Sequence, residues 1–177
     1  MLGDDKRIMK INTGIRHRHN RGVTFTELLV AVVVMSIGVL GVAALQAISL
    51  QQNRSALFRA EATQVASDIL DRIRANPTAT YAPVEIDAVP PAATNCYAEE
   101  CDIDQMATFD ISSWKCQLDS TDDDGDTYSI CTTLNVASSL PDGAGSVTLD
   151  GTTYSVTVRW VDDRDGNTKS IILRSVL

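Results

Sequence analysis

Residues 21–45 read RGVTFTELLVAVVVMSIGVLGVAAL, and this stretch decides the architecture of the chain. Within it, residues 28–45 are 18 consecutive residues without a charge. At about 1.5 Å per residue, a helix of that length extends roughly 27 Å, which is close to the hydrocarbon thickness of a bilayer. The stretch therefore predicts a membrane-spanning helix.

The charges of the 177-residue chain are divided between two regions. Residues 1–21 hold six cations and two acids, a net charge of +4, whereas residues 23–177 hold nine cations and 21 acids, a net charge of −12. Such an acidic body repels nucleic acid, because duplex binding depends on cations that neutralise phosphates. Both histidines, His17 and His19, lie in the basic region. The acidic body thus lacks the base of Ser-His-Asp catalysis and the commonest transition-metal ligand, so we expect no enzyme, no cofactor and no nucleic-acid binding.

The cations that flank the apolar stretch lie on its N-terminal side. The positive-inside rule therefore predicts a cytoplasmic N-terminus and a body exported across the membrane. A removable signal peptide is one alternative, although its apolar region usually spans only about 7–15 residues. An ordinary signal-anchor is another. Neither alternative accounts for Glu27, a carboxylate at the very start of the apolar run.

Glu27 has two interpretations. Thr24 and Glu27 match the S/T-x-x-E capping box, which would make the carboxylate a local device at the start of a helix. Alternatively, a cut after Gly22 would create a new amino group on Val23, four residues before Glu27. An amine and a carboxylate at the membrane interface would then be natural partners, within one molecule or between neighbours.

The helical pattern continues beyond the membrane stretch. Apolar or small residues recur three or four positions apart, which is the period of an amphipathic helix; they are Phe58, Ala62, Val65, Ala66, Ile69 and Ile73. Asp68 and Arg72 form a correctly oriented i,i+4 pair on the polar side. Pro77 disfavours helical geometry at Asn76, so the pattern predicts one helix over residues 24–75.

The C-terminal third has the pattern of an antiparallel sheet. Tyr154, Val156, Val158 and Trp160 alternate with polar residues, as expected of a half-buried strand. Asp150-Gly151 and Asp165-Gly166 are hairpin signals on either side of it. We expect flanking strands at residues 146–149 and 169–177, and a further candidate at 128–136. An α+β fold, with this sheet packed on the second half of the long helix, would bury both apolar faces.

The middle of the chain reads as a loop over residues 78–95, followed by one or two short helices over residues 104–118. Asp102 and Asp110 are expected helix N-caps. Met106, Phe109 and Trp114 are expected to anchor the helical segment on the sheet.

Four cysteines follow the loop: Cys96, Cys101, Cys116 and Cys131. Their spacing disfavours a Cys₄ zinc site, which usually shows two close pairs. In an exported domain two disulfides are the default, and three connectivities are open. Asp122, Asp124 and Asp126 invite a calcium interpretation, but the spacing is not that of an EF-hand, and a solvated acidic turn is the simpler reading.

The residues Arg21-Gly22-Val23-Thr24-Phe25-Thr26-Glu27, followed by the apolar run, resemble the class III leader and mature N-terminus of type IV prepilins. The resemblance implies that prepilin peptidase cuts after Gly22 and methylates the new N-terminus at Val23. It also implies that Glu27 helps each incoming subunit dock into the filament. The first mature residue of that family is usually phenylalanine, and here it is Val23.

Residues 68–77, DILDRIRANP, together with SIGVLG at residues 36–41, resemble the PilV family of minor pilins, the type IV pilus modification proteins. The resemblance implies a pilin-like fold, and a C-x₄-C pair at this place implies a Cys96–Cys101 disulfide, which leaves Cys116 with Cys131. The implied domains are a cleaved leader at residues 1–22, a membrane and assembly half of the long helix at 23–50, and a periplasmic head at 51–177.

The function implied is that of a structural minor pilin, involved in pilus assembly or initiation and thereby in twitching motility, adhesion or DNA uptake. The implied partners are prepilin peptidase, other minor and major pilins, the inner-membrane assembly platform and the lipid bilayer. A type II secretion pseudopilin is an alternative that shares the leader and Glu27. A different class of alternative is an exported ligand-binding or adhesive module on an ordinary anchor.

Overall fold

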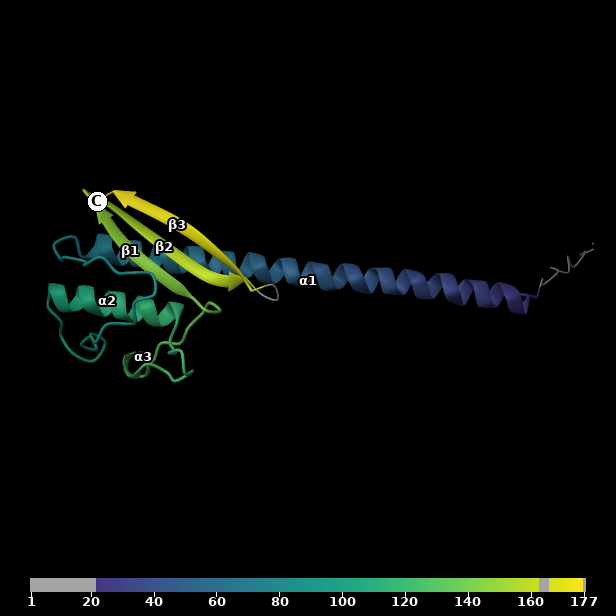
Figure 1. The fold of residues 1–177 in the computed structure, drawn as a ribbon, viewed down its shortest axis with the longest axis horizontal. Helices are drawn as coiled ribbons and strands as arrows, with labels where there is room; N and C mark the ends of the chain where they lie inside the picture. The colour runs from purple at the N-terminus through teal and green to yellow at the C-terminus, as the bar shows by residue number, and fades with distance from the viewer. Residues whose placement is uncertain (1–21, 163–165, 177) are drawn as a thin grey trace, which may run out of the picture. The chain divides into compact units, whose positions relative to one another are not determined.

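A computed structural model describes residues 22–162 and 166–176. The basic leader at residues 1–21 therefore lies outside the described residues, as do Asp165 of the second hairpin signal and Leu177. The chain divides into two compact units, residues 1–45 and 46–177. The elements follow in the order α1, α2, α3, β1, β2, β3 (Figure 1).

The long helix α1 spans Phe25–Ala75, one residue shorter than the pattern predicted. At its start, the Glu27 backbone N–H donates to Thr24 Oγ1 at 3.4 Å, which is the N-cap half of the expected capping box. Its last turn carries Arg72 and Arg74, whose charges suit the negative end of the helix dipole. The side chain of Asn76 then donates to the Ile103 carbonyl at 2.8 Å, just before Pro77.

In the first unit, every described residue, 22–45, is exposed. Within the described chain, α1 is the one helix whose length and apolar composition would suffice to cross a bilayer. Since its backbone groups are bonded along the helix, this surface has the properties required of a lipid-facing span.

The core of the second unit lies between one face of α1 and one face of the sheet. The buried α1 residues are Ala62, Val65, Ala66, Ile69, Leu70 and Ile73, which is the predicted stripe with Leu70 added and with Phe58 only partly buried. On the sheet, Val156 and Val158 are fully buried, and Tyr154 and Trp160 lie on the same face. The α+β prediction, with the long helix packed on an antiparallel sheet, is confirmed.

The sheet is a three-stranded antiparallel meander in the order β1–β2–β3. Its strands are β1 (Ala144–Asp150), β2 (Thr153–Asp162) and β3 (Asn167–Val176), so the flanking strands begin two residues earlier than predicted. Val156 pairs with Val147 on one side and with Leu173 on the other. Gly151, at φ 61°, makes the predicted first hairpin.

The first residues of β1 lie close to α2, which spans Ile103–Leu118. A Cβ atom on Gly145 would lie 2.5 Å from Leu118 Cδ1 and 2.6 Å from Trp114 Cη2. Only glycine at this position of β1 leaves room for the side chains of Leu118 and Trp114.

The middle segment forms a single helix, α2, which is one of the two predicted possibilities. Asp102 is its N-cap as predicted, and it forms a complete capping box with Gln105. The N-cap prediction for Asp110 is wrong, because Asp110 lies inside α2 and is buried. Its carboxylate accepts from the Arg72 guanidinium at 3.2 Å and from the Tyr81 hydroxyl at 2.7 Å. A buried carboxylate with these partners ties α2 to the end of α1.

Two of the three expected anchors behave differently from the prediction. Trp114 is fully buried in the core, and its indole N–H donates to the Val65 carbonyl at 3.0 Å. Phe109 is buried outside the main core, where it makes an edge-to-face contact with Tyr97 at 4.9 Å between ring centroids. Met106 is only half-buried. Phe109 therefore supports the disulfide loop and does not cover the sheet.

The candidate strand at residues 128–136 is wrong. This segment contains a short helix, α3 (Ser129–Leu134), which ends at Asn135 in the left-handed conformation. The backbone N–H of Asn135 returns to carbonyls of the last turn, as in a helix C-cap. The disulfide from Cys131 to Cys116 of α2 outweighs the strand propensity of the β-branched residues here.

The two aspartates of α2 should differ in their contribution to stability. We expect Asp102→Ala to lower the free energy of unfolding by about 1 kcal/mol, the usual cost of losing an N-cap. Asp110→Ala should cost about 3 kcal/mol, because it leaves Arg72 and Tyr81 without their buried partner. Urea unfolding of the full chain in detergent micelles, followed by the fluorescence of Trp114 and Trp160, measures both. Equal effects would contradict the assignment of Asp110.

Candidate functional site

The segment that precedes α1 is open to solvent. Gly22, Val23 and Thr24 are not helical, and all three are exposed. The peptide bond between Gly22 and Val23 thus lies in a non-helical, accessible segment. A protease needs such a segment, since a bond inside a helix has its backbone groups occupied.

Glu27 lies in the first turn of α1 and is exposed. Its backbone N–H is capped by Thr24, but within the described residues its carboxylate forms neither a hydrogen bond nor an ion pair. Glu27 is therefore a charge at the edge of an apolar surface that has no partner in the described part of its own chain.

The surface that follows Glu27 is apolar around the whole helix. Large side chains on all sides of α1 are at least half-exposed in the first unit; they include Leu28, Val33, Met35, Ile37, Leu40 and Leu45. An apolar surface of this size is stable only in lipid or against other apolar surfaces. Gly22, Val23, Glu27 and this surface together form the candidate processing and assembly site.

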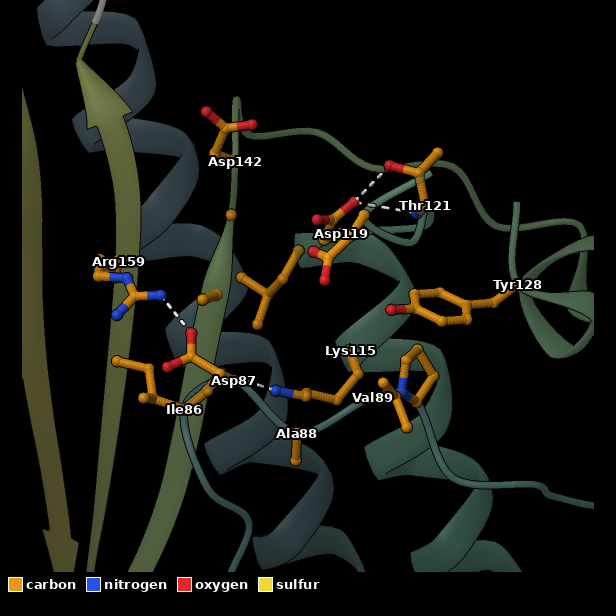
Figure 2. Close-up of a pocket in the computed structure, with 15 residues that line it drawn as sticks. Ile86, Asp87, Ala88, Val89, Lys115, Asp119, Thr121, Tyr128, Asp142 and Arg159 are labelled. Atoms are coloured by element: carbon orange, nitrogen blue, oxygen red, sulfur yellow. Dashed lines mark hydrogen bonds and ion pairs between the residues drawn. The ribbon is translucent and has the colours of Figure 1, made fainter. Parts of the chain in front are cut away.

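The second unit holds a polar cavity of about 330 Å³ between the loop at residues 86–90, the end of α2 and the start of β1 (Figure 2). Its rim carries Asp119, Tyr128 and Asp142. Asp87 and Arg159 form an ion pair across one side. Burial and the nearby aspartates raise the pKa of Tyr128.

Lys115 lies at the floor of this cavity and is buried. Its ammonium group donates to the carbonyls of Glu85 at 3.3 Å, Ile86 at 3.0 Å and Gly145 at 2.9 Å. An ammonium has three donors, and all three are used. Lys115 is thus a clamp that joins α2 to the loop and to β1, not a free nucleophile.

Burial lowers the pKa of Lys115 to about 8, while the nearby carboxylate of Asp87 opposes this effect. Sequence reasoning missed this residue. The available signal was its position as a single cation between Trp114 and Cys116, on a helix otherwise expected to face the core.

The structure joins Cys96 to Cys101 and Cys116 to Cys131, the pairing that the resemblance implied. The first disulfide closes a short loop before α2. The second links α2 to α3 and is fully buried.

The acidic turn has a local role. The Asp122 carboxylate accepts from the backbone N–H groups of Asp124 at 3.1 Å and Asp126 at 2.8 Å. Gly125, at φ 85°, completes the turn. Across the described ranges, no group of three acidic, histidine or cysteine side chains is placed to hold a metal ion. The calcium alternative at Asp122, Asp124 and Asp126 thus gains no support from this geometry.

Comparison with known families gives two adjoining matches. Residues 17–43 match the prokaryotic N-terminal methylation motif, a range that includes Gly22, Val23 and Glu27. Residues 44–112 match the family described as type IV pilin Tt1218, a range that covers the second half of α1, the first disulfide and much of α2. No curated protein and no solved structure matches the chain.

The depressed pKa of Lys115 makes stability depend on pH. Between about pH 8 and pH 10.5 the unfolded chain holds a proton that the folded chain has released, so the free energy of unfolding should rise with pH. We expect a gain of about 2 kcal/mol from pH 7.5 to 9.5. Urea unfolding at the two pH values measures it. Lys115→Met should abolish the gain and Lys169→Met, on the exposed part of β3, should keep it; the opposite pattern would refute the assignment.

Proposed function

We propose that this chain is a minor pilin, a structural subunit of a type IV pilus. The observation that carries the proposal is the continuity of three features along the chain. A methylation motif containing Gly22 and Glu27 leads into an exposed apolar helix, and that helix continues into a segment of the type IV pilin family. The α+β head is the fold that such a subunit requires.

Prepilin peptidase would cut between Gly22 and Val23 and methylate the new amino group. The cut would remove the +4 leader with both histidines and leave a subunit with a net charge of −12. Before the cut, the leader would hold the N-terminus in the cytoplasm, with residues 23–50 in the inner membrane and the head, residues 51–177, in the periplasm.

Assembly would then use Glu27 and the apolar half of α1. Leaving the bilayer moves the helix from lipid to the apolar helices of neighbouring subunits, so burial of apolar surface alone does not drive docking. An unpaired carboxylate in an apolar environment is costly, and the methylated amine of a neighbour would relieve that cost. Glu27 would therefore set the axial position of each incoming subunit.

The resemblance to the PilV family favours a role in pilus initiation or decoration, with consequences for twitching motility, adhesion or DNA uptake. The resemblance also allows a type II secretion pseudopilin, which would share the leader and Glu27. Deletion of the chain separates the two: loss of surface pili and twitching with normal secretion supports the pilus, and the reverse pattern supports the pseudopilin. An adhesive module on an ordinary anchor would keep residues 1–22 in the mature protein.

Processing can be tested at the predicted bond. In a host with active prepilin peptidase, the intact mass of the wild-type chain should correspond to residues 23–177 with one added methyl group. Gly22→Val should retain the leader, because a side chain at this position blocks the cut. Gly41→Ala, within the same apolar region, is the control and should be processed normally. An unprocessed wild-type chain would contradict the proposal.

Assembly can be tested separately at Glu27. Glu27→Gln should be cut and methylated like the wild type, yet its amount in sheared pili should fall about tenfold or more, because the neighbour's amine loses its charged partner. Glu27→Asp, which keeps the carboxylate, should recover part of the loss. Normal incorporation of Glu27→Gln would show that Glu27 serves only as part of the helix cap.

A further inference from the structure

The net charge of the chain beyond the leader is concentrated in one layer of the head. Residues 78–143 hold 13 acids and one cation, whereas residues 23–77 and 144–177 each hold four acids and four cations. The one cation of the layer, Lys115, is buried and bonded to three carbonyls. We name residues 78–143, which contain α2, α3 and their loops, the acidic layer. Within it, Asp110 is buried against Arg72 and Asp87 pairs with Arg159, whereas the other 11 acids have no exposed cation within the layer to balance them.

The opposite edge of the head has the reverse character. Strand β3 contains Lys169 and Arg174 and no acid, and both cations are exposed. Neither forms an ion pair within the described part of the chain. Arg74 of α1 lies beside the end of the strand, where it donates to Ser175 at 2.8 Å, but its charge is paired with Asp71. We name β3 with Lys169 and Arg174 the basic edge.

The basic edge is also an unfinished sheet edge. In the described sheet β3 pairs only with β2, so one side of its backbone has no strand partner. Ile172 and Val176 are exposed on it, at 56% and 71%. Natural proteins usually cover or charge such an edge, because it is a ready surface for another chain. Lys169 and Arg174 restrict that partner to one that carries negative charge.

The two surfaces lie on opposite sides of the head. The acidic layer adjoins β1, where Lys115 donates to the Gly145 carbonyl, and β3 lies at the far end of the sheet (Figure 1). A symmetric pairing of two β3 strands would bring four strand cations together with no acid between them. A head-to-tail pairing would set the basic edge of one copy against the acidic layer of the next, and such contacts propagate without closing.

We propose that the basic edge binds the acidic layer of a second copy of this chain. The contact rests on the proposed function for its head-to-tail direction, since a filament is built from interfaces of this kind. Its chemistry is electrostatic at Lys169 and Arg174 and apolar at Ile172 and Val176. It would orient neighbouring heads after Glu27 has set the position of the helices.

Site-specific photocrosslinking of the full chain in cells tests the contact. A photoreactive amino acid replaces Ser170, which is exposed on β3, in one of two differently tagged copies. Irradiation should join the two tags, and mass spectrometry should place the adduct within residues 78–143. The same amino acid at Thr148, exposed on β1, is the matched control and should give little adduct between copies.

Charge variants of the basic edge provide a second test of the contact. Lys169→Glu with Arg174→Glu should reduce the adduct about tenfold or more, because like charges then face each other. Lys169→Arg with Arg174→Lys should leave it unchanged. If the reversed variant fails to form both disulfides, Lys169→Gln with Arg174→Gln takes its place and should give an intermediate reduction.

Four results would overturn the inference: no adduct between copies, an adduct between two β3 strands, an adduct with another protein only, or an adduct that charge reversal leaves unchanged. Processing at Gly22 and surface pili are scored in the same cells. A processed, piliated strain without the adduct rejects the contact and keeps the proposed function. An unprocessed chain that still gives the adduct rejects the pilin function and keeps the contact.

Discussion

The packing of one α1 face on β2 supports the rest of the second unit. Three aliphatic side chains at this interface are fully buried: Val156, Val158 and Ile69. Burial of each stabilises the fold by about 1.5–3 kcal/mol relative to an exposed side chain. Ala62 and Ala66 keep the helix surface shallow, so that neighbouring layers can approach closely. Trp114 then closes the core from α2 and bonds to the helix backbone at Val65. Without this face, neither the three-stranded sheet nor α2 has a layer to cover it.

The two halves of α1 have surfaces that suit different surroundings. In the first unit the apolar residues lie all round α1, which suits lipid or other helices, whereas in the second unit they form one stripe. The polar side of that stripe carries Asp68 and Arg72, and Arg72 continues to Asp110. The change from a uniform surface to a stripe separates the half of α1 that suits an apolar environment from the half that supports a folded head.

The acidic and basic residues beyond the leader are unevenly distributed among the elements of the chain. Residues 23–77 and 144–177, which contain α1 and the sheet, each hold equal numbers of acids and bases. The loops, α2 and α3 carry the whole excess of acid. Of the two edge strands of the meander, β1 bonds to Val84 and Ile86 of the preceding loop, whereas β3 pairs only with β2 within the described sheet.

Several features were predictable because they depend on local chemistry. The end of α1 follows from Pro77, the N-cap of α2 from Asp102, and the buried face of β2 from strict alternation. The wrong predictions concern residues whose structure is determined by contacts with residues far away in the sequence. Asp110 looks like a cap, yet Tyr81 and Arg72 hold it inside a helix. Residues 129–134 have the composition of a strand, yet a disulfide to α2 and the turn at Asn135 make them helical. Phe109 looks like a core anchor until Tyr97 is found beside it.

The sequence by itself therefore determined the membrane-compatible helix, the methylation motif that contains Gly22 and Glu27, the α+β class and the residues of β2 that face the core. These properties depend on periodicity, charge and neighbours within a few residues. Only the tertiary structure showed the three carbonyl groups that accept from Lys115, the buried role of Asp110 and the separation of the acidic layer from the basic edge. Each of these needs side chains brought together from segments tens of residues apart, and that proximity exists only after the helix and the sheet have packed.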